Sequence, residues 1–382
     1  MKIGIIGWYG YNNLGDEVIL HVILKQLLTK VTIEDIVVFS EKPSVVEQVH
    51  NIRSVLIGYE GKLGNFISEL EKIDFLIFGG GGFISDWQPE AMPNTFKIAC
   101  MAKAFGKKII FYSVGVGPIL TDNGKILIKK MCDLSDLITV RDQNCYDLLT
   151  GIGVKNVFTT SDPAVIFDEI DDKAGKYLIQ DLNTDRPIVG IYISYFMHND
   201  KYWPNKFDEF LKYKKTMIKL VYYLYHQLRL QPVFIPVFPV DEDFAKEIVK
   251  EGNLEYEIPI LRFSSDYRLV TGILAHTIMV IGTRLHALIL SSISRVPVIG
   301  IIVHPKSEQY LKSIGLDKLA VALGDGAMYP ESRIDFEKLK ESVQYILENR
   351  EHICEHMMSK ILLLKSKQEI NFRLLLETLQ IH

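Results

Sequence analysis

Two residues that could bind an anion and transfer a proton, Arg284 and His286, stand two positions apart in one short segment. An apolar run at 278–281 predicts a buried strand ending at Gly282, and apolar residues at helical spacing from 285 onward predict a helix. The start of a helix favours an anion, an arginine adds a charged fork, and a histidine adds a proton that moves near neutral pH. We therefore predict an anion site with acid–base chemistry. The alternative is that Arg284 pairs with a surface carboxylate and His286 caps the helix.

A second group of polar residues follows the buried-type strand expected at 2–7. Asn13, Gly15 and Asp16 belong to a glycine-containing loop that leads into an amphipathic helix expected at about 18–29. The glycine spacing fits neither GxGxxG nor a Walker loop. Two adjacent acids here would repel a pyrophosphate, so we expect Asp16 to accept a hydrogen bond or a proton from a hydroxyl. The alternative is that it only complements the helix dipole.

Three further loops follow strands expected at 74–78, 108–113 and 137–140. The carboxyl ends of parallel strands lie at one edge of a sheet, where open α/β sheets bind ligands. A run of four glycines in the first of these loops permits close approach of a ligand to the backbone. The candidate ligand-binding residues of the three loops are Gly80, Gly81, Gly82, Asp86, Ser113, Gly115 and Arg141. For Arg141, a structural pair with an aspartate is the alternative.

Repeated units of strand, loop and helix fill both halves of the chain and predict an α/β fold with two doubly wound parallel sheets. We expect an N-terminal Rossmann-like domain over 1–170 and a C-terminal one over 186–350, with the acidic segment 168–185 as a linker. A long amphipathic helix is expected at about 356–378, and the tail 356–382 is expected to pack back on the first domain.

Composition and charge exclude several classes of protein. A net charge of −4 over 382 residues does not favour nucleic-acid binding. The four cysteines form no CxxC pair, so we expect neither disulfides nor a zinc site, and a reducing cytoplasm fits. We find no signal-peptide pattern and no apolar run near the roughly 20 residues of a spanning helix. Basic and aromatic residues in 201–225 suit peripheral contact with the inner face of a membrane, and the alternative is a solvated helix face over a core stripe.

Six segments, taken in order, resemble the motifs of polysaccharide pyruvyltransferases. The segment 7–17 resembles the family's opening G-x-x-G-x-x-N-x-G-D-E. The other five are Gly79-Gly80-Gly81-Gly82, Ser113-Val114-Gly115-Val116-Gly117-Pro118, Val140-Arg141-Asp142, Ser161-Asp162-Pro163-Ala164 and Gly282-Thr283-Arg284-Leu285-His286-Ala287. The resemblance covers about 1–315. It implies a GT-B-like fold whose two domains face an interdomain cleft, phosphoenolpyruvate as donor, and no metal or cofactor.

The resemblance also implies the reaction and its residues. The acceptor would be a sugar of a cell-surface polysaccharide, such as exopolysaccharide or cell wall, or of its lipid-linked precursor, and the products a pyruvate ketal and phosphate. His286 would be the general acid, and Asp16 would handle the acceptor hydroxyls. The donor would be bound by Gly282, Thr283, Arg284, Lys306 and Arg141, and the acceptor by Asn13, Gly15, Gly80, Gly81, Gly82, Asp86, Ser113 and Gly115.

One departure and two alternatives accompany this assignment. The loop before Lys306 carries Val303-His304-Pro305 where the family more usually has a Tyr-Asp, so the role of Lys306 is the least supported. Arg141 could serve either substrate. The alternatives are a GT-B glycosyltransferase that uses a nucleotide sugar, and a non-catalytic glycan-binding protein on the same scaffold.

Overall fold

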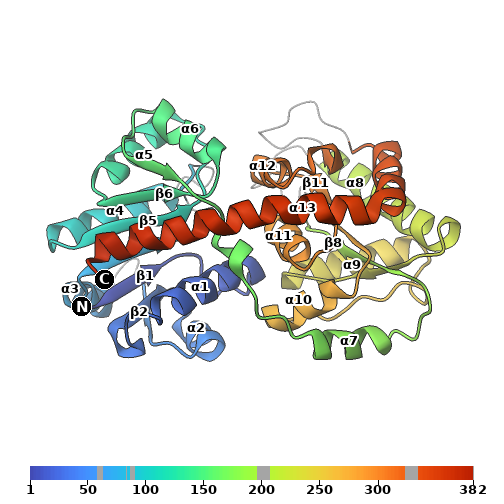
Figure 1. The fold of residues 1–382 in the computed structure, drawn as a ribbon, viewed down its shortest axis with the longest axis horizontal. Helices are drawn as coiled ribbons and strands as arrows, with labels where there is room; N and C mark the ends of the chain where they lie inside the picture. The colour runs from blue at the N-terminus through green and yellow to red at the C-terminus, as the bar shows by residue number, and fades with distance from the viewer. Residues whose placement is uncertain (58–62, 83, 87–90, 196–206, 323–333, 382) are drawn as a thin grey trace. The chain divides into compact units, whose positions relative to one another are not determined.

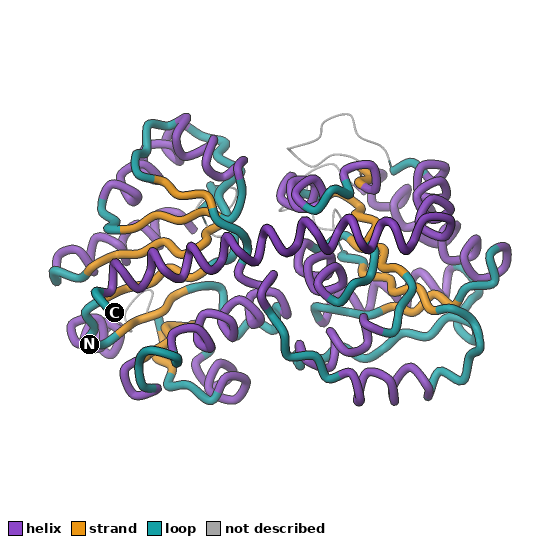
Figure 2. Tube along the Cα trace, in the orientation of Figure 1, coloured by secondary structure: helices purple, strands orange, loops and turns teal. Residues whose placement is uncertain are grey.

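The computed structural model of the protein describes residues 1–57, 63–82, 84–86, 91–195, 207–322 and 334–381. They form two compact units. The first unit comprises Met1–Ile166 and Leu363–His382, and the second comprises Phe167–Leu362. In each unit a parallel sheet lies between helices (Figures 1 and 2).

The first unit contains a seven-stranded parallel sheet of order β3-β2-β1-β4-β5-β6-β7. Its inner strands are buried along their whole length because helices cover both faces, which explains their continuous apolar runs. The strand order reverses between β1 and β4, so this sheet has its topological switch point there. The strands are β1 (Ile3–Ile6), β2 (Ile36–Ser40), β3 (Ser54–Leu56), β4 (Phe75–Gly79), β5 (Lys108–Val114), β6 (Leu137–Val140) and β7 (Val157–Thr159). The helices are α1 (Leu14–Leu27), α2 (Pro43–His50), α3 (Leu63–Lys72), α4 (Ala91–Ala104), α5 (Asp122–Asp133) and α6 (Gln143–Gly151).

The second unit contains a five-stranded parallel sheet of order β12-β11-β10-β8-β9. Its order reverses between β8 and β10, so a second switch point lies where these strands end. The strands are β8 (Ile188–Tyr192), β9 (Gln231–Phe234), β10 (Met279–Gly282), β11 (Val298–Ile302) and β12 (Ala320–Ala322). The helices are α7 (Asp172–Gln180), α8 (Phe207–Tyr222), α9 (Pro239–Glu251), α10 (Tyr267–Ala275), α11 (Leu285–Ile293) and α12 (Pro305–Ser313), and a π-helical turn, Tyr223–Gln227, extends α8.

The acidic segment 168–185, expected to be a linker, contains helix α7. The side chain of Asp171 caps this helix by accepting the N–H of Ala174 at 3.0 Å. The helix then packs against α10 so closely that a Cβ on Gly175 would lie 2.3 Å from the carbonyl carbon of Gly272. The polar composition of the segment gives no sign of this packing, because its partner, Gly272, lies far along the chain.

The C-terminal helix expected at about 356–378 is the second part of a longer element, α13 (Phe336–Leu379), drawn in red in Figure 1, in which two helices meet at a kink. The helix is kinked at Asn349, where φ is −125° and ψ is 20°. Its last turns belong to the first unit, where two amides from α13 donate to the hydroxyl of Ser113. The distances are 3.1 Å from Nε2 of Gln368 and 2.8 Å from Nδ2 of Asn371.

Helix α8 buries a stripe of aromatic residues in the second unit and exposes three of its lysines, Lys212, Lys215 and Lys219. Phe210, Tyr213 and Tyr223 belong to the core, and Lys214 pairs with two glutamates of α9. Residues 201–206 of this region lie outside the described part of the chain. The structure therefore favours the alternative of a solvated face over a core stripe for α8.

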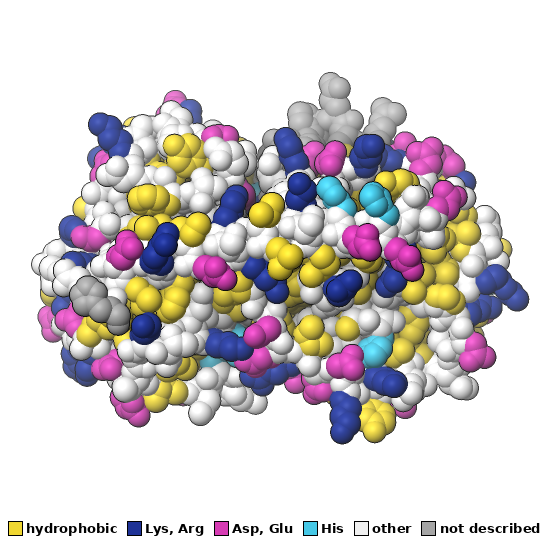
Figure 3. All heavy atoms as spheres, in the orientation of Figure 1, with side chains coloured by type: hydrophobic (Ala, Val, Ile, Leu, Met, Phe, Trp, Pro, Cys, Tyr) yellow, Lys and Arg dark blue, Asp and Glu magenta, His cyan; other side chains and the backbone are white. Residues whose placement is uncertain are grey.

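Figure 3 shows acidic and basic side chains interspersed on one face of the molecule. Among the described residues, no helix is both long and apolar enough to span a membrane.

Candidate active-site residues at two sheet edges

The turn that carries Arg284 and His286 lies between a strand and a helix, as predicted, and this strand end is at the switch point of the second sheet. Strand β10 ends at Gly282, Arg284 is the N-cap residue of α11, and His286, which is half-buried, stands in the first turn. Helix N-caps are usually Ser, Thr, Asp or Asn, whose side-chain oxygen accepts a helical N–H. A guanidinium has no acceptor, and the Arg284 side chain makes no capping hydrogen bond. The positive end of α11 therefore begins without a side-chain cap from its own N-cap residue.

The guanidinium of Arg284 forms a bidentate ion pair with Asp241, in the first turn of α9. Nε lies 2.9 Å from Oδ2 and Nη2 lies 3.0 Å from Oδ1. Asp241 is 2% exposed, and burial raises the pKa of its carboxyl while Arg284 opposes that rise. The guanidinium also lies 5.4 Å from the ring centroid of Phe238. The pair uses two of the five N–H donors and fixes the plane of the fork. The predicted alternative of a carboxylate partner is therefore real, but the partner is buried rather than on the surface.

The residues around Arg284 fix the turn itself. The N–H of Thr283 donates to the carbonyl of Tyr192 at 2.9 Å, and its buried hydroxyl donates to Oγ of Ser194 at 3.1 Å. A Cβ on Gly282 would lie 3.2 Å from Cβ of Tyr192, so glycine permits this approach. These contacts give Gly282 and Thr283 a positioning role at the end of β10.

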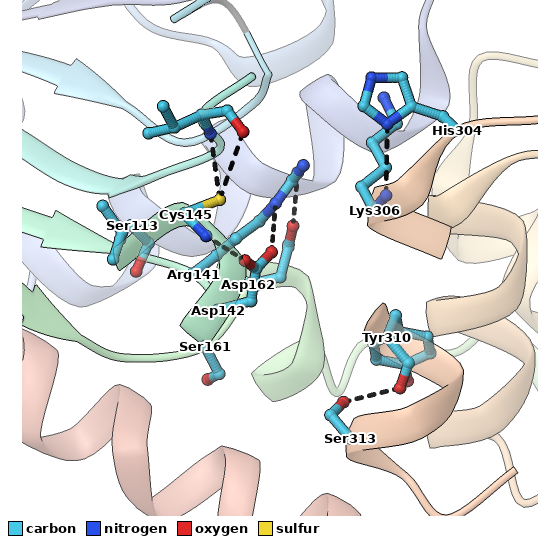
Figure 4. A network of polar contacts seen from close by, with 12 residues as sticks. Ser113, Arg141, Asp142, Cys145, Ser161, Asp162, His304, Lys306, Tyr310 and Ser313 are labelled. Atoms are coloured by element: carbon cyan, nitrogen blue, oxygen red, sulfur yellow. Dashed lines mark hydrogen bonds and ion pairs between the residues drawn. The ribbon is translucent and has the colours of Figure 1, made fainter. Parts of the chain in front are cut away.

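Lys306 begins a separate helix at the same edge of the second sheet. It lies in the first turn of α12, whose N-cap is His304. Nδ1 of His304 accepts the N–H of Lys306 at 3.2 Å (Figure 4). His304 therefore acts as the side-chain cap of α12.

In the first unit, helix α1 begins at Leu14, earlier than expected, because Asn13 is its N-cap. The side-chain oxygen of Asn13 accepts the N–H of Gly15 at 3.3 Å. Both acids of the first turn are buried: Asp16 is 6% exposed and Glu17 is 1% exposed. The loop into α1 therefore ends in a side-chain cap, which is followed at once by two buried acids.

Arg141 lies at the carboxyl end of β6, where Figure 4 shows its guanidinium joined to two carboxylates. Nε is 3.5 Å from Oδ2 of Asp142, and Nη1 is 3.5 Å from Oδ2 of Asp162. Burial acts to lower the pKa of Arg141, but the charges of Cys145, Asp162, Asp142 and Asp16 outweigh it and raise the pKa. Arg141 is 8% exposed and surrounded by more negative charge than it carries. This edge therefore suits a neutral hydroxyl better than a multiply charged anion.

The glycines of the first unit are explained mainly by close packing of loops. Gly80 has φ of +58°, and a Cβ there would lie 2.4 Å from a methyl carbon of Ile19. The carbonyl of Gly81 accepts the N–H of Gly115 at 2.7 Å, and a Cβ on Gly115 would lie 2.6 Å from the guanidinium carbon of Arg141. Gly82 is exposed, so contact of this loop with a ligand stays a prediction for it.

Two predicted acceptor ligands have structural contacts instead. The carboxylate of Asp86 accepts the backbone N–H groups of Leu120 and Thr121 at 2.6 and 2.7 Å, which fixes the approach to α5. Ser113 is 0% exposed, and its hydroxyl lies 2.9 Å from that of Thr160. A hydroxyl with no exposed surface cannot reach a substrate, so the assignment of Ser113 to the acceptor site is wrong.

Comparison with known proteins bears on both fold and family. A family model described as polysaccharide pyruvyl transferase matches residues 13–305 of the chain. A sequence search of the curated proteins found no match.

Solved structures share the architecture. The Anabaena protein Alr3699/HepE in complex with UDP matches with a TM-score of 0.64 and 12% identity over 100% of both chains. The UDP-GlcNAc 2-epimerase of Neisseria meningitidis bound to UDP-GlcNAc matches with a TM-score of 0.62 and 10% identity over 100% of both chains. A glycosyltransferase from Rickettsia africae matches with a TM-score of 0.58 and 12% identity over 99% of this chain and 98% of its own. These similarities confirm the predicted α/β, GT-B-like fold, and at such identities they carry no further information on function.

Proposed function

The chain belongs to the polysaccharide pyruvyl transferase family, and we propose that it transfers the enolpyruvyl group of phosphoenolpyruvate to two hydroxyls of a sugar in a cell-surface polysaccharide or its lipid-linked precursor. The observation that carries the donor assignment is the start of α11. There a fixed guanidinium and a histidine flank a helix N-terminus at the switch point of the second sheet. Phosphoenolpyruvate carries a carboxylate and a phosphate, and both require cations and N–H donors.

The proposed reaction begins with proton transfer. His286, as the imidazolium, gives its proton to the methylene carbon, which becomes the methyl group and leaves the central carbon electrophilic. One acceptor hydroxyl then adds to that carbon, and its proton passes to Asp16 and returns to the histidine through solvent. The carbon–oxygen bond to phosphate breaks. The second hydroxyl closes the ketal, and its proton leaves with the phosphate. These steps need no metal or nucleotide cofactor.

The two arginines are given different tasks. Arg284, with Lys306 as a second cation, would hold the donor, and the first unit would hold the acceptor through Asp16 and Asn13. Arg141 is better matched to the acceptor, because Asp142 and Asp162 surround it with negative charge. All four cysteines are free thiols. This agrees with the cytoplasmic location that we propose on the ground that the donor is a cytoplasmic metabolite.

The direct experiment is to incubate the full chain with phosphoenolpyruvate and a panel of oligosaccharides, and to measure released phosphate and the ketal product by mass spectrometry. His286→Ala should lower turnover by a factor of about 10²–10⁴, the usual contribution of a general acid. His276→Ala is the matched control. His276 belongs to the second unit, where it follows the last residue of α10 and pairs with Asp172 of α7. Turnover of His286→Ala near that of wild type would rule out the acid role.

Ligand binding separates this proposal from a nucleotide-sugar glycosyltransferase. Phosphoenolpyruvate should raise the unfolding temperature, and UDP should not. Arg284→Lys should weaken donor binding because a lysine cannot form the bidentate fork. Stabilisation by UDP alone, with no phosphate release from any acceptor, would favour the glycosyltransferase alternative. Absence of response to either ligand would favour a glycan-binding protein.

A further inference from the structure

The indole of Trp8 lies on the surface of the first unit, directly after strand β1. It is 46% exposed and stacks on the ring of Tyr11, with ring centroids 4.4 Å apart and planes inclined by 11°. Single exposed apolar side chains are common on proteins, so exposure alone assigns no role. The way this ring is held is what distinguishes it.

The supporting ring of Tyr11 is fixed by two charged neighbours. Its hydroxyl donates a hydrogen bond to the carboxylate of Glu41. The ammonium of Lys42 lies over the ring, 4.9 Å from its centroid, in a cation–π contact. Trp8 and Tyr11 therefore form a supported pair of parallel rings, which we name the Trp8–Tyr11 platform.

The backbone on either side of Trp8 is fixed as well. The carbonyl of Tyr9 accepts a hydrogen bond from Oγ of Ser40 at 2.8 Å. The N–H of Gly10 donates to the carboxylate of Glu17 at 2.8 Å, and Gly10 has φ of +85°, which glycine adopts without strain. A surface that is already held in one conformation loses little entropy when a ligand binds to it.

The location and surroundings of the platform indicate its ligand. It belongs to the same loop as Asn13 and Asp16, at the carboxyl end of β1 and beside the switch point of the first sheet. A hexopyranose has a face of C–H groups that packs on an aromatic ring, and a rim of hydroxyls that hydrogen-bond to charged groups such as those of Glu41 and Lys42. A protein partner would need about 800 Å² on each side, far more than two rings with a charged rim provide.

We propose that the Trp8–Tyr11 platform is a subsite that stacks on one hexopyranose ring of the acceptor glycan. This inference rests on the proposed function, since it names the class of ligand that the first unit would hold there. It adds a recognition element that is independent of the reacting groups. The hydroxyls to be pyruvylated would then lie on that ring or on a neighbouring one.

Binding can be tested without catalysis. The chain has three tryptophans, so Trp87→Phe with Trp203→Phe leaves Trp8 as the only indole. This variant is titrated with the methyl glycosides of glucose, galactose, mannose and N-acetylglucosamine, and with UDP. We expect a saturable change in tryptophan fluorescence with at least one hexoside. No response to any hexoside, or a response to UDP alone, would overturn the proposal.

Kinetics provide the second test, with the oligosaccharide that supports phosphate release. Trp8→Ala should raise the acceptor KM about tenfold, the typical loss of an aromatic anchor, and leave the KM for phosphoenolpyruvate unchanged. Trp8→Phe should restore most of the affinity because it keeps a ring. Phe158→Ala, which removes an aromatic ring on β7 that is 44% exposed, should change neither KM.

Different results would refute the Trp8–Tyr11 subsite and the proposed reaction. An unchanged acceptor KM in Trp8→Ala would overturn the subsite and leave the proposed reaction intact. If wild type releases no phosphate with any acceptor on the panel, the proposed reaction fails. The fluorescence titration still decides whether Trp8 binds a hexose.

Discussion

Replacing Arg284 by glutamine should destabilise the second unit through the carboxylate that remains. Asp241 is 2% exposed, and both of its oxygens are within 3.0 Å of the guanidinium. Breaking a buried pair from the cation side leaves an uncompensated charge, which costs about 3–5 kcal/mol. The side chain of Arg284 is 27% exposed, so water can reach this pair and we expect about 3 kcal/mol at pH 7, at the low end of that range. For a unit of this size, this corresponds to a fall of roughly 6–12 °C in unfolding temperature.

The stability lost in Arg284→Gln should depend on pH, and the direction of this dependence can be worked out. Burial raises the pKa of Asp241 above its ordinary value, and Arg284 opposes that rise. Without Arg284 the folded-state pKa rises further, while the unfolded value stays near the ordinary ~3.9. A carboxyl with a raised folded-state pKa contributes stability that is present below the unfolded pKa and lost as the pH rises through the folded one. The deficit of Arg284→Gln should therefore be largest at pH 7 and shrink as the pH is lowered towards about 4.5.

The assay is thermal unfolding followed by circular dichroism at several pH values, with Asp241→Asn as the matched control. That variant removes the same ion pair from the other side and leaves a partly exposed cation that water can solvate, so its loss should be smaller. Its amide does not titrate, so its deficit should not shrink at acid pH. A deficit of Arg284→Gln that is equal at pH 5 and pH 7, or no larger than that of Asp241→Asn, would refute the reasoning.

Four further substitutions, one of them a control, test contacts within each unit by thermal unfolding. Gly272→Ala should cost more than 1 kcal/mol, because its Cβ would lie 2.1 Å from the carbonyl oxygen of Asp171, whereas Gly64→Ala, with open space around it, should be neutral or slightly stabilising. His50→Ala should destabilise the first unit by about 1–3 kcal/mol, because it removes a 2.9 Å partner from the buried carboxylate of Glu17. Gln368→Ala should destabilise the same unit by a similar ~1–3 kcal/mol and increase hydrogen exchange at the end of β5, since its amide donates to a buried hydroxyl there.

The sequence predicted those parts of the fold that depend on neighbouring residues. Strands ending in glycine loops, followed by helices, placed Arg141 and Arg284 at the carboxyl edges of two sheets, and the structure confirms both positions. Helix α6 begins with another local feature of this kind: the side chain of Asp142 caps it by accepting the N–H of Cys145 at 2.8 Å. Such features can be read from sequence because caps and strand ends involve residues only a few positions apart.

Contacts between distant residues could not be predicted in this way. Asp241 had the appearance of an ordinary acid in the first turn of a helix, and nothing near it in sequence indicated Arg284 as its partner. The hydroxyl of Ser113 is buried by amides 255 and 258 positions away, so a residue expected at the ligand-binding edge of the sheet is part of the core. The sequence predicts that the glycines at 79–82 face a ligand, whereas Gly79 and Gly80 are required by side chains of other elements, such as Ile19 beside Gly80.

Electrostatic interactions indicate whether Arg141 or Arg284 would better bind the proposed donor, phosphoenolpyruvate, which carries three negative charges. Two unit charges about 4 Å apart interact by roughly 4 kcal/mol at the effective dielectric constant near a protein surface. At Arg141, an anion would gain one such attraction and meet the repulsion of Asp142, Asp162 and Asp16, so the balance is unfavourable. At Arg284, the carboxylate of Asp241 is already matched by the guanidinium, and the positive end of α11 adds to the attraction. The buried ion pair, which first looks like a competitor for the anion, therefore holds the guanidinium in place beside the positive end of a helix.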